Sequence, residues 1–195
     1  MASKVTLEKV IFLDRDGVIN RDSPDYIKTW DEFEFLPGSL EALRLLTENG
    51  YRLIVITNQS IINRGWVPQA VLDHTHRRLR EAVAAAGGQI FDIFFCPHRP
   101  DENCACRKPK PGLIAQACAR HGIDPAASIM IGDNATDILC GRNAGCGATL
   151  LVRTGYNPTA EQTLAEQNTP ADAVAADLEE AARMILSNEL FAGRK

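Results

Sequence analysis

Short, continuously apolar runs alternate with longer amphipathic stretches along the 195-residue chain. A run that is apolar throughout is typical of a strand buried on both faces, as in parallel sheets covered by helices. The alternation therefore predicts an α/β fold with a mainly parallel sheet between helical layers. The predicted strands are residues 9–13, 51–56, 90–95, 128–131 and 148–152. The predicted helices are residues 39–48, 68–86, 111–120, 134–143 and 178–186.

Chain length and composition predict a single domain over residues 1–195. Hydrophobic residues make up 45% of the chain and charged residues 24%, which suits one globular domain with a substantial core. Two irregular stretches interrupt the pattern, at residues 20–37 and 99–107. Because open α/β sheets bind ligands in loops beyond their strand ends, both stretches are candidate specificity elements.

The charge balance favours a small-molecule partner. A net charge of −4 argues against binding of nucleic acid or of an anionic membrane, which usually requires a concentrated basic face. Residues 1–10 lack the long uncharged run of a secretory signal or membrane span, so we expect a cytoplasmic protein. The small size favours a monomer.

Acidic pairs follow two of the predicted strands. Asp14 and Asp16 come after the first strand, and Asp133 and Asp137 follow the strand at residues 128–131. Alone, each pair is more often a solvated turn or a helix cap. Two carboxylates held together need a compensating cation, and a divalent metal with oxygen ligands is the usual one. Asp137 is either an additional carboxylate of the metal site or an acid in the first turn of a helix.

Polar and basic groups occupy two further positions in the same pattern. Thr57, Asn58 and Gln59 follow the second predicted strand, where a hydroxyl and backbone N–H groups can face an anion. Arg107 and Lys108 precede a predicted helix. Alone, the first group would be a helix cap and the second a solvated surface. Because all four motifs fall at strand ends or helix starts in this order, we expect them to converge at one edge of the sheet.

A cluster of cysteines and a histidine predicts a structural zinc site in a loop at about residues 96–108. A Cys-x-His pair and a Cys-x-Cys pair, five residues apart, supply four ligands, so no coordination position remains for water. The ligands are Cys96, His98, Cys104 and Cys106. Such crowding in a reducing compartment indicates metal binding and not disulfides. The remaining cysteines are predicted to be small core residues, namely Cys118, Cys140 and Cys146.

The ordered motifs resemble those of the haloacid dehalogenase (HAD) superfamily of phosphohydrolases over nearly the whole chain. The resemblance implies a three-layer Rossmann-like fold with a minimal cap. It also implies that Asp14 is the nucleophile of an aspartyl-phosphate mechanism and that Asp16 is the general acid and base. Thr57 and Lys108 would stabilise the transferring phosphoryl group. The catalytic Mg²⁺ would be held by Asp14, by the backbone carbonyl of Asp16 and by Asp133.

The zinc loop with its Arg-Lys-Pro sequence resembles one subgroup of this superfamily. That subgroup contains D-glycero-D-manno-heptose-1,7-bisphosphate 7-phosphatases, which act in lipopolysaccharide-precursor synthesis, and histidinol-phosphate phosphatases. The loop at residues 20–37 and the sequences at 57–60 and 151–155 favour the heptose enzymes, whereas the short zinc-loop spacer favours the histidinol enzymes.

From this resemblance we expect the substrate to be a small sugar phosphate, heptose 1,7-bisphosphate, which would lose its 7-phosphate, with histidinol phosphate as the alternative. The predicted substrate-binding residues are Asp22, Asp25, Asn58, Gln59, Ser60, Arg107 and Asn134. A bisphosphate needs a second cationic contact, for which the candidates are Arg107, Arg64, Arg21 and Lys28. A hypothesis of another class is an inactive, zinc-stabilised binding module on the same fold, because a fold alone does not specify function.

Overall fold

A computed structural model describes residues 9–187 of the chain. Within them, six strands form one sheet in the order β3-β2-β1-β4-β5-β6, and every pair of neighbouring strands is parallel. The strands are β1 (Val10–Leu13), β2 (Arg52–Asn58), β3 (Ile90–Cys96), β4 (Ser128–Gly132), β5 (Ala148–Val152) and β6 (Ala173–Ala175). The prediction of an α/β fold with a parallel sheet is confirmed.

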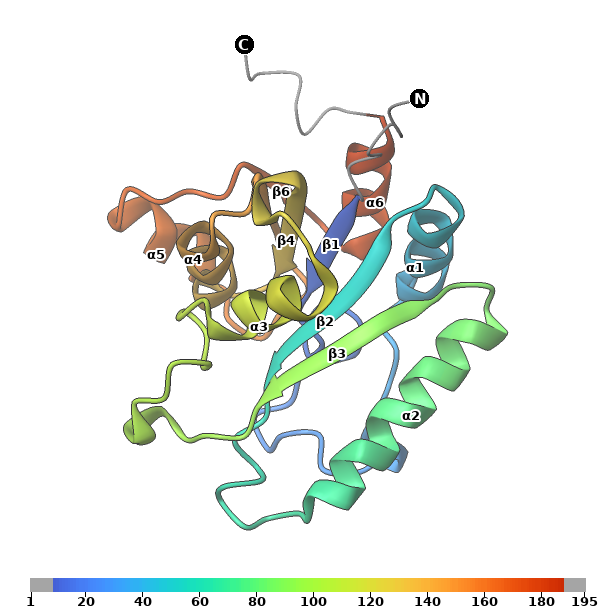
Figure 1. Cartoon of the computed structure of the whole chain (residues 1–195), viewed down its shortest axis with the longest axis vertical. Coiled ribbons are helices and arrows are strands. Elements are labelled where there is room, and N and C mark those ends of the chain that lie inside the picture. Colours follow the sequence, from blue (N-terminus) through green and yellow to red (C-terminus); the bar gives the residue numbers. More distant parts are fainter. Residues whose placement is uncertain (1–8, 188–195) are drawn as a thin grey trace.

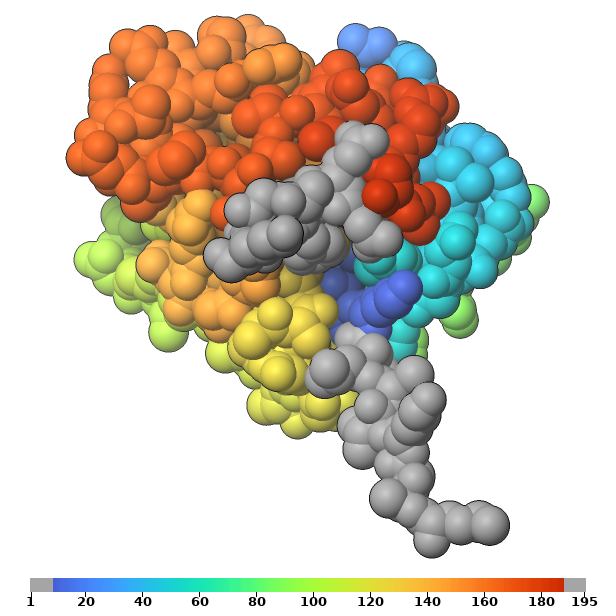
Figure 2. Space-filling view, turned by 90° about the horizontal axis from the view of Figure 1, so that it is seen from above, coloured from blue at the N-terminus to red at the C-terminus, as the bar shows by residue number. Residues whose placement is uncertain are grey.

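Helices cover both faces of the sheet, which gives three layers (Figure 1). Helices α1, α2 and α6 lie on one side, and α3 and α4 lie on the other, with α5 next to α4. Their bounds are α1 (Ser39–Glu48), α2 (Gln69–Ala85), α3 (Gly112–His121), α4 (Ala135–Ala144), α5 (Ala160–Glu166) and α6 (Leu178–Leu186). In Figure 2, the red segment that includes α6 adjoins the cyan region of α1, and these two helices are in contact.

Each central strand contributes side chains to two hydrophobic cores because successive residues of a strand point to opposite faces. In β1, Ile11 and Leu13 join the core beneath α1, α2 and α6, whereas Val10 and Phe12 join the core beneath α3. All four residues are at most 1% exposed. This double burial explains why the strand is apolar throughout and why the sequence pattern identified it.

The predicted boundaries of β2 were too short, and two small elements were missed. The strand β2 continues through Asn58, so Thr57 and Asn58 belong to the strand and do not follow it. Their polar side chains hid the end of the strand from the apolar pattern. The strand β6 has only three residues and α5 only seven, so each offers little periodicity.

The topology brings the predicted motifs together. Strand β1 lies at the centre of the sheet, between β2 and β4. From β1 the chain adds β2 and β3 on one side and then crosses to add β4, β5 and β6 on the other. Such a switch point opens a crevice at the carboxyl ends of the strands. Asp14, Thr57 and Asp133 all lie at this edge. Among the helices of residues 9–187, none has the length and apolar character needed to cross a membrane.

Candidate active site and metal sites

Lys108 lies at the centre of the converging motifs. Its Nζ is 2.8 Å from Oδ1 of Asp14 and 2.6 Å from Oδ1 of Asp137. The Lys108 and Asp137 side chains are only 2% and 1% exposed, and the two carboxylates raise the pKa of the lysine even though burial opposes the charge. Lys108 is therefore a buried cation that borders a cavity of about 400 Å³ together with Asp14, Asp16, Thr57 and Asp133.

Three carboxylates crowd together on one side of Lys108. Oxygens of Asp14, Asp133 and Asp137 all lie within 4.8 Å of one another. Burial and repulsion from its neighbours raise the pKa of Asp133 to about 9. Burial, opposed by Lys108, raises the pKa of Asp14 to about 7. A single lysine thus does not balance three carboxylates, and the cluster retains protons that a divalent cation would replace. Oxygen donors of this kind suit Mg²⁺. The cluster fits the predicted magnesium site.

Two glycines allow the backbone to approach Asp133 closely. A Cβ at Gly155 would lie 1.9 Å from Oδ2 of Asp133, and one at Gly17 would lie 2.6 Å from the same oxygen. Gly17 also has a φ of +81°, which glycine adopts without strain. Thr154 precedes Gly155, and its hydroxyl donates a 2.6 Å hydrogen bond to the carbonyl of Gly17. The loop after β5 therefore holds both Asp133 and the turn that follows Asp16.

Asp16 is held as an ionised carboxylate. Nη2 of Arg15 donates to both of its oxygens, at 2.8 and 2.9 Å. Asn20 Nδ2 and Gln59 Nε2 donate to it at 2.9 and 2.8 Å. Burial alone would raise the pKa of Asp16, but Arg15 and these hydrogen bonds lower it overall. Asp16 is therefore ionised in the protein without substrate.

The side-chain amides of Asn58, at the end of β2, and of Gln59, the next residue, hold other parts of the site in place. Gln59 is 2% exposed, and its amide nitrogen donates to Thr57 as well as to Asp16. The Asn58 side chain accepts from the backbone N–H of Lys108 at 3.2 Å and donates to its carbonyl at 3.4 Å. The structure therefore gives both predicted substrate-binding amides contacts within the protein, although Asn58 also borders the cavity.

Asn134 is the N-cap residue of helix α4 and forms a capping box with Asp137. The Asn134 side chain accepts from the backbone N–H of Thr136 at 3.2 Å, and Asp137 accepts from the backbone N–H of Asn134 at 3.0 Å. One oxygen of Asp137 thus caps the helix while the other pairs with Lys108. Asp137 is therefore an acid in the first turn of the helix and also a member of the acidic cluster, while its role as an additional carboxylate of a metal site stays a prediction. Asn134 borders the cavity while its oxygen caps the helix.

The remaining predicted substrate contacts fall at different places. Asp22 and Arg107 border the cavity next to Lys108. Asp25 lies outside it and borders a neighbouring cavity of about 390 Å³. Ser60 is 1% exposed, and its hydroxyl accepts from Arg64 Nε at 3.3 Å. Of the candidate second cations, only Arg107 borders the cavity itself. Arg21 instead pairs with Glu34, and Lys28 pairs with Glu32. The Arg64 guanidinium packs over the Trp66 ring.

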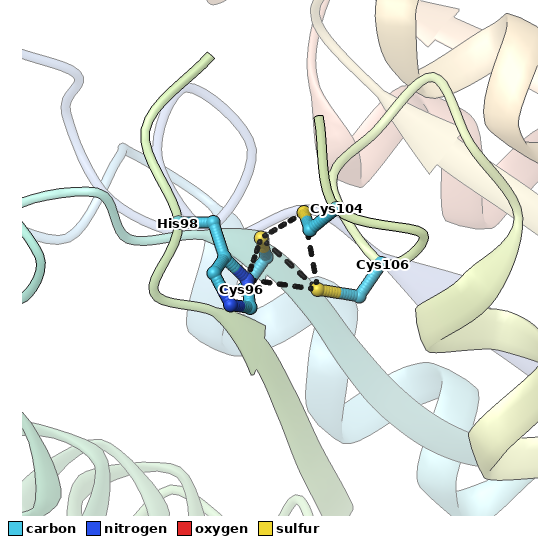
Figure 3. A group of neighbouring side chains, drawn as sticks. All are labelled: Cys96, His98, Cys104 and Cys106. Carbon is cyan, nitrogen blue, oxygen red and sulfur yellow. Dashed lines mark hydrogen bonds between the residues drawn. The ribbon is translucent and has the colours of Figure 1, made fainter. Parts of the chain in front are cut away.

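The four predicted zinc ligands lie together at the end of β3 and in the loop that follows (Figure 3). Sulfur–sulfur distances among Cys96, Cys104 and Cys106 are 3.2 to 3.5 Å. Nδ1 of His98 lies 3.5 Å from the sulfur of Cys96 and 3.3 Å from that of Cys106. Ligand atoms around a tetrahedral zinc lie roughly 3.8 Å apart, so this compact donor set fits the ion after a small expansion.

The zinc loop is joined directly to the active site. The backbone N–H of Arg107 points at the sulfur of Cys104 at 3.3 Å, and the Arg107 guanidinium donates to the carbonyl of His98 at 3.1 Å. Lys108 follows and is held by Asn58. Among the other cysteines, Cys140 is buried in the core beneath α3. Cys118 and Cys146 are partly buried and pack against that core.

Motif reasoning missed four residues of the site, namely Arg15, Asn20, His76 and Thr154. Arg15 and Asn20 contact Asp16, His76 contacts Arg15, and Thr154 contacts Gly17. Arg15 stands between the two aspartates of the first motif, which was a signal that it belongs to the site. Thr154 lies in the sequence at residues 151–155 that the resemblance singled out, although no role was predicted for it. His76 comes from a distant segment, and only tertiary packing identifies it.

Comparison with known proteins points to one kind of enzyme. A family model described as HAD-hydrolase-like matches residues 105–181. A Pseudomonas aeruginosa D-glycero-β-D-manno-heptose-1,7-bisphosphate 7-phosphatase is 46% identical over 160 residues, which cover 80% of this chain and 90% of that protein. The enzyme of the same name from Bordetella bronchiseptica is 42% identical over 162 residues, covering 83% and 88%.

A solved structure gives the same result. The crystal structure of D,D-heptose 1,7-bisphosphate phosphatase from B. bronchiseptica, in complex with magnesium and phosphate, superposes with a TM-score of 0.85 at 40% identity. The match covers 92% of this chain and 99% of that one. The relatives are therefore similar over nearly their full length.

Proposed function

Because the chain belongs to the heptose-1,7-bisphosphate 7-phosphatase family of HAD-like hydrolases, we propose that it removes the 7-phosphate of D-glycero-D-manno-heptose 1,7-bisphosphate. The reaction is the magnesium-dependent hydrolysis of a phosphoric monoester, and it belongs to heptose metabolism for lipopolysaccharide. The observation that carries the proposal is the buried ion pair of Lys108 with Asp14 and Asp137, next to Asp133.

The first step transfers the phosphoryl group to Asp14. A carboxylate oxygen of Asp14 forms a bond to phosphorus while the bond from phosphorus to the sugar oxygen breaks. The electron pair stays on that oxygen, which takes a proton from Asp16 and leaves as an alcohol. The lowered pKa of Asp16 keeps it ionised in the protein without substrate, so Asp16 takes up the proton for this step from solvent as the phosphate dianion approaches.

The second step hydrolyses the aspartyl phosphate. Asp16, now ionised, accepts a proton from a water molecule while the water oxygen bonds to phosphorus. The bond between phosphorus and Asp14 then breaks, which releases inorganic phosphate and restores the carboxylate. The contacts of Asp16 with Arg15, Asn20 and Gln59 stabilise the form that this step requires.

Charge stabilisation comes from the groups that surround Asp14. Lys108 and the Thr57 hydroxyl would contact the transferring oxygens. Asp14, Asp133 and the backbone carbonyl of Asp16 would hold Mg²⁺, whose chemistry when bound is to neutralise the repulsion between the nucleophile and the phosphate dianion. Arg107 borders the same cavity and is the cation that we assign to the second phosphate of the substrate.

We assign a structural role to zinc. Cys96, His98, Cys104 and Cys106 supply four protein ligands, so bound zinc would order the loop that carries Arg107 and Lys108. We further propose that residues 1–195 form a single phosphatase domain, which acts as a cytoplasmic monomer without nucleic acid or membrane partners. The enzyme class of the relatives favours this function over an inactive zinc-stabilised binding module.

The covalent mechanism is tested by Asp14→Asn. The amide has nearly the shape of the carboxylate but is a poor nucleophile, so we expect phosphate release to fall by at least about 10³-fold. Acid quenching during turnover of the wild-type enzyme should trap phosphate bound to Asp14, and the variant should trap none. A folded Asp14→Asn enzyme with wild-type turnover would rule the mechanism out.

A further inference from the structure

Arg15 is the largest completely buried side chain of the described residues. Arg15 lies between the two catalytic aspartates in the sequence, and its Nη2 pairs with both oxygens of Asp16. A guanidinium is always charged and carries five N–H donors, so each buried donor needs an acceptor. The position of Asp16 therefore depends on what holds the rest of Arg15.

His76 supplies a contact on the other side of the guanidinium. Its Nε2 lies 3.4 Å from Nη1 of Arg15, although the two residues are 61 positions apart. His76 is 7% exposed, and burial together with the Arg15 charge lowers its pKa to about 3, so the ring is neutral. Because a guanidinium cannot accept a hydrogen bond, Nε2 is the acceptor and Nδ1 carries the proton.

Aromatic rings pack against both the His76 ring and the Arg15 guanidinium. The His76 ring packs edge-on against Phe95 of β3, with ring centres 5.8 Å apart. The Phe33 ring lies 5.8 Å from the Arg15 guanidinium. Helix α2 thus reaches the active site through a chain of contacts from His76 to Arg15 to Asp16, outside every motif of the sequence.

We propose that His76 is a positioning residue for proton transfer: as a buried hydrogen-bond acceptor on α2, it orients Arg15 so that Arg15 holds Asp16 in place for acid and base catalysis. The inference rests on the proposed function, in which Asp16 protonates the leaving oxygen. His76 itself does not border the cavity that Asp14 and Lys108 line.

The chemistry of the leaving group separates this role from simple packing. An alkoxide leaving from a sugar phosphate is strongly basic and needs the proton of Asp16, whereas a nitrophenolate leaves without one. A misplaced Asp16 therefore slows transfer of the phosphoryl group from the sugar phosphate to Asp14 much more than transfer from p-nitrophenyl phosphate. The ratio kcat/KM reports this first step, because the second step, which also uses Asp16, is common to both esters. A variant with a loosened core loses both activities to the same extent.

The experiment compares His76→Phe with His76→Gln on heptose 1,7-bisphosphate and p-nitrophenyl phosphate, both with Mg²⁺. Phenylalanine keeps a ring but removes the acceptor, and glutamine places an acceptor near the position of Nε2. His74→Phe is the matched control because His74 is exposed on the same helix. If His76→Phe does not fold, His76→Asn replaces it, since its shorter side chain ends before the guanidinium.

We expect His76→Phe to lower kcat/KM for the heptose bisphosphate by about 10- to 100-fold, a large part of the usual effect of general acid catalysis. The same variant should stay within about threefold of wild type on p-nitrophenyl phosphate, and His76→Gln within about threefold on both esters. Equal losses on the two esters, no loss on either, or failure of glutamine to restore activity would each overturn the inference. A wild-type enzyme that hydrolyses neither ester would overturn the proposed function and this inference with it.

Discussion

At the scale of single residues, the acidic cluster makes magnesium binding depend on pH. The pKa values of Asp14 and Asp133, about 7 and about 9, lie above the ordinary value of 3.8. The folded, metal-free protein therefore keeps protons that the unfolded chain releases, and it loses stability as the pH rises from about 4 to about 9. A bound divalent cation competes with those same protons.

The expected result is that Mg²⁺ raises the melting temperature more at about pH 8.5 than at about pH 6. Thermal unfolding with and without Mg²⁺ at the two pH values measures the difference. In Asp133→Asn, which removes one of the proposed ligands, the shift should be much smaller at both values. A shift of equal size at both pH values, or a larger one at pH 6, would show that these carboxylates do not bind the ion.

Residues within motifs were predictable because their chemistry and their place at strand ends agree. Asp14, Asp133 and Lys108 were identified in this way, and the structure brings them together. The partners of Asp16 were harder to find. Arg15 would ordinarily be a solvated charge, and His76 lies on a helix with ordinary amphipathic spacing, so their contact arises only when α2 packs beside the sheet.

At the scale of elements, the loop after β5 packs against the predicted magnesium site. Gly155 lies against Asp133, and an added methyl group would overlap the carboxylate. We expect Gly155→Ala to displace Asp133, to weaken Mg²⁺ binding by at least about tenfold and to lower turnover at limiting Mg²⁺. Magnesium titration of activity measures the change.

Tyr156→Ala is the matched control for Gly155→Ala, since Tyr156 is the next residue and is 68% exposed. It should leave the dependence on Mg²⁺ unchanged. An unaltered magnesium titration in Gly155→Ala would show that the close packing of this loop on Asp133 has no part in metal binding.

The zinc loop and the acidic cluster should respond differently to metal removal. Loss of zinc, by chelation or in Cys106→Ser, frees the loop before Arg107 and Lys108, so we expect a melting temperature lower by roughly 5–10 °C and reduced turnover. Removal of Mg²⁺ alone should abolish turnover while the protein stays folded. Circular dichroism melts and activity assays on the same samples distinguish the two effects, and equal unfolding in both cases would contradict this division.

Element prediction succeeded where burial on both faces produced an unbroken apolar run. The bounds of α1, β5 and α6 agree with the sequence pattern to the residue. The pattern failed at the end of β2, where Thr57 and Asn58 have polar side chains because they serve the site. It also failed for β6, whose three residues are too few to carry a period.

At the scale of the whole molecule, the order of the strands decides which motifs meet. The sequence pattern predicted a parallel sheet, and parallel strands end at the same edge, so convergence of the motifs could be expected. The order β3-β2-β1-β4-β5-β6 could not be read from periodicity. It places Asp14 at the end of the central strand, with Thr57 and Asp133 at the ends of its two neighbours.

The substrate is the property of the whole molecule that most directly tests this account. The measurement is phosphate release with Mg²⁺ from heptose 1,7-bisphosphate and from histidinol phosphate in parallel, with kcat/KM for each and identification of the heptose product. We predict a kcat/KM at least about 10²-fold higher for the bisphosphate, with heptose 1-phosphate as the product. Equal or faster hydrolysis of histidinol phosphate, or loss of the 1-phosphate, would contradict the proposed function.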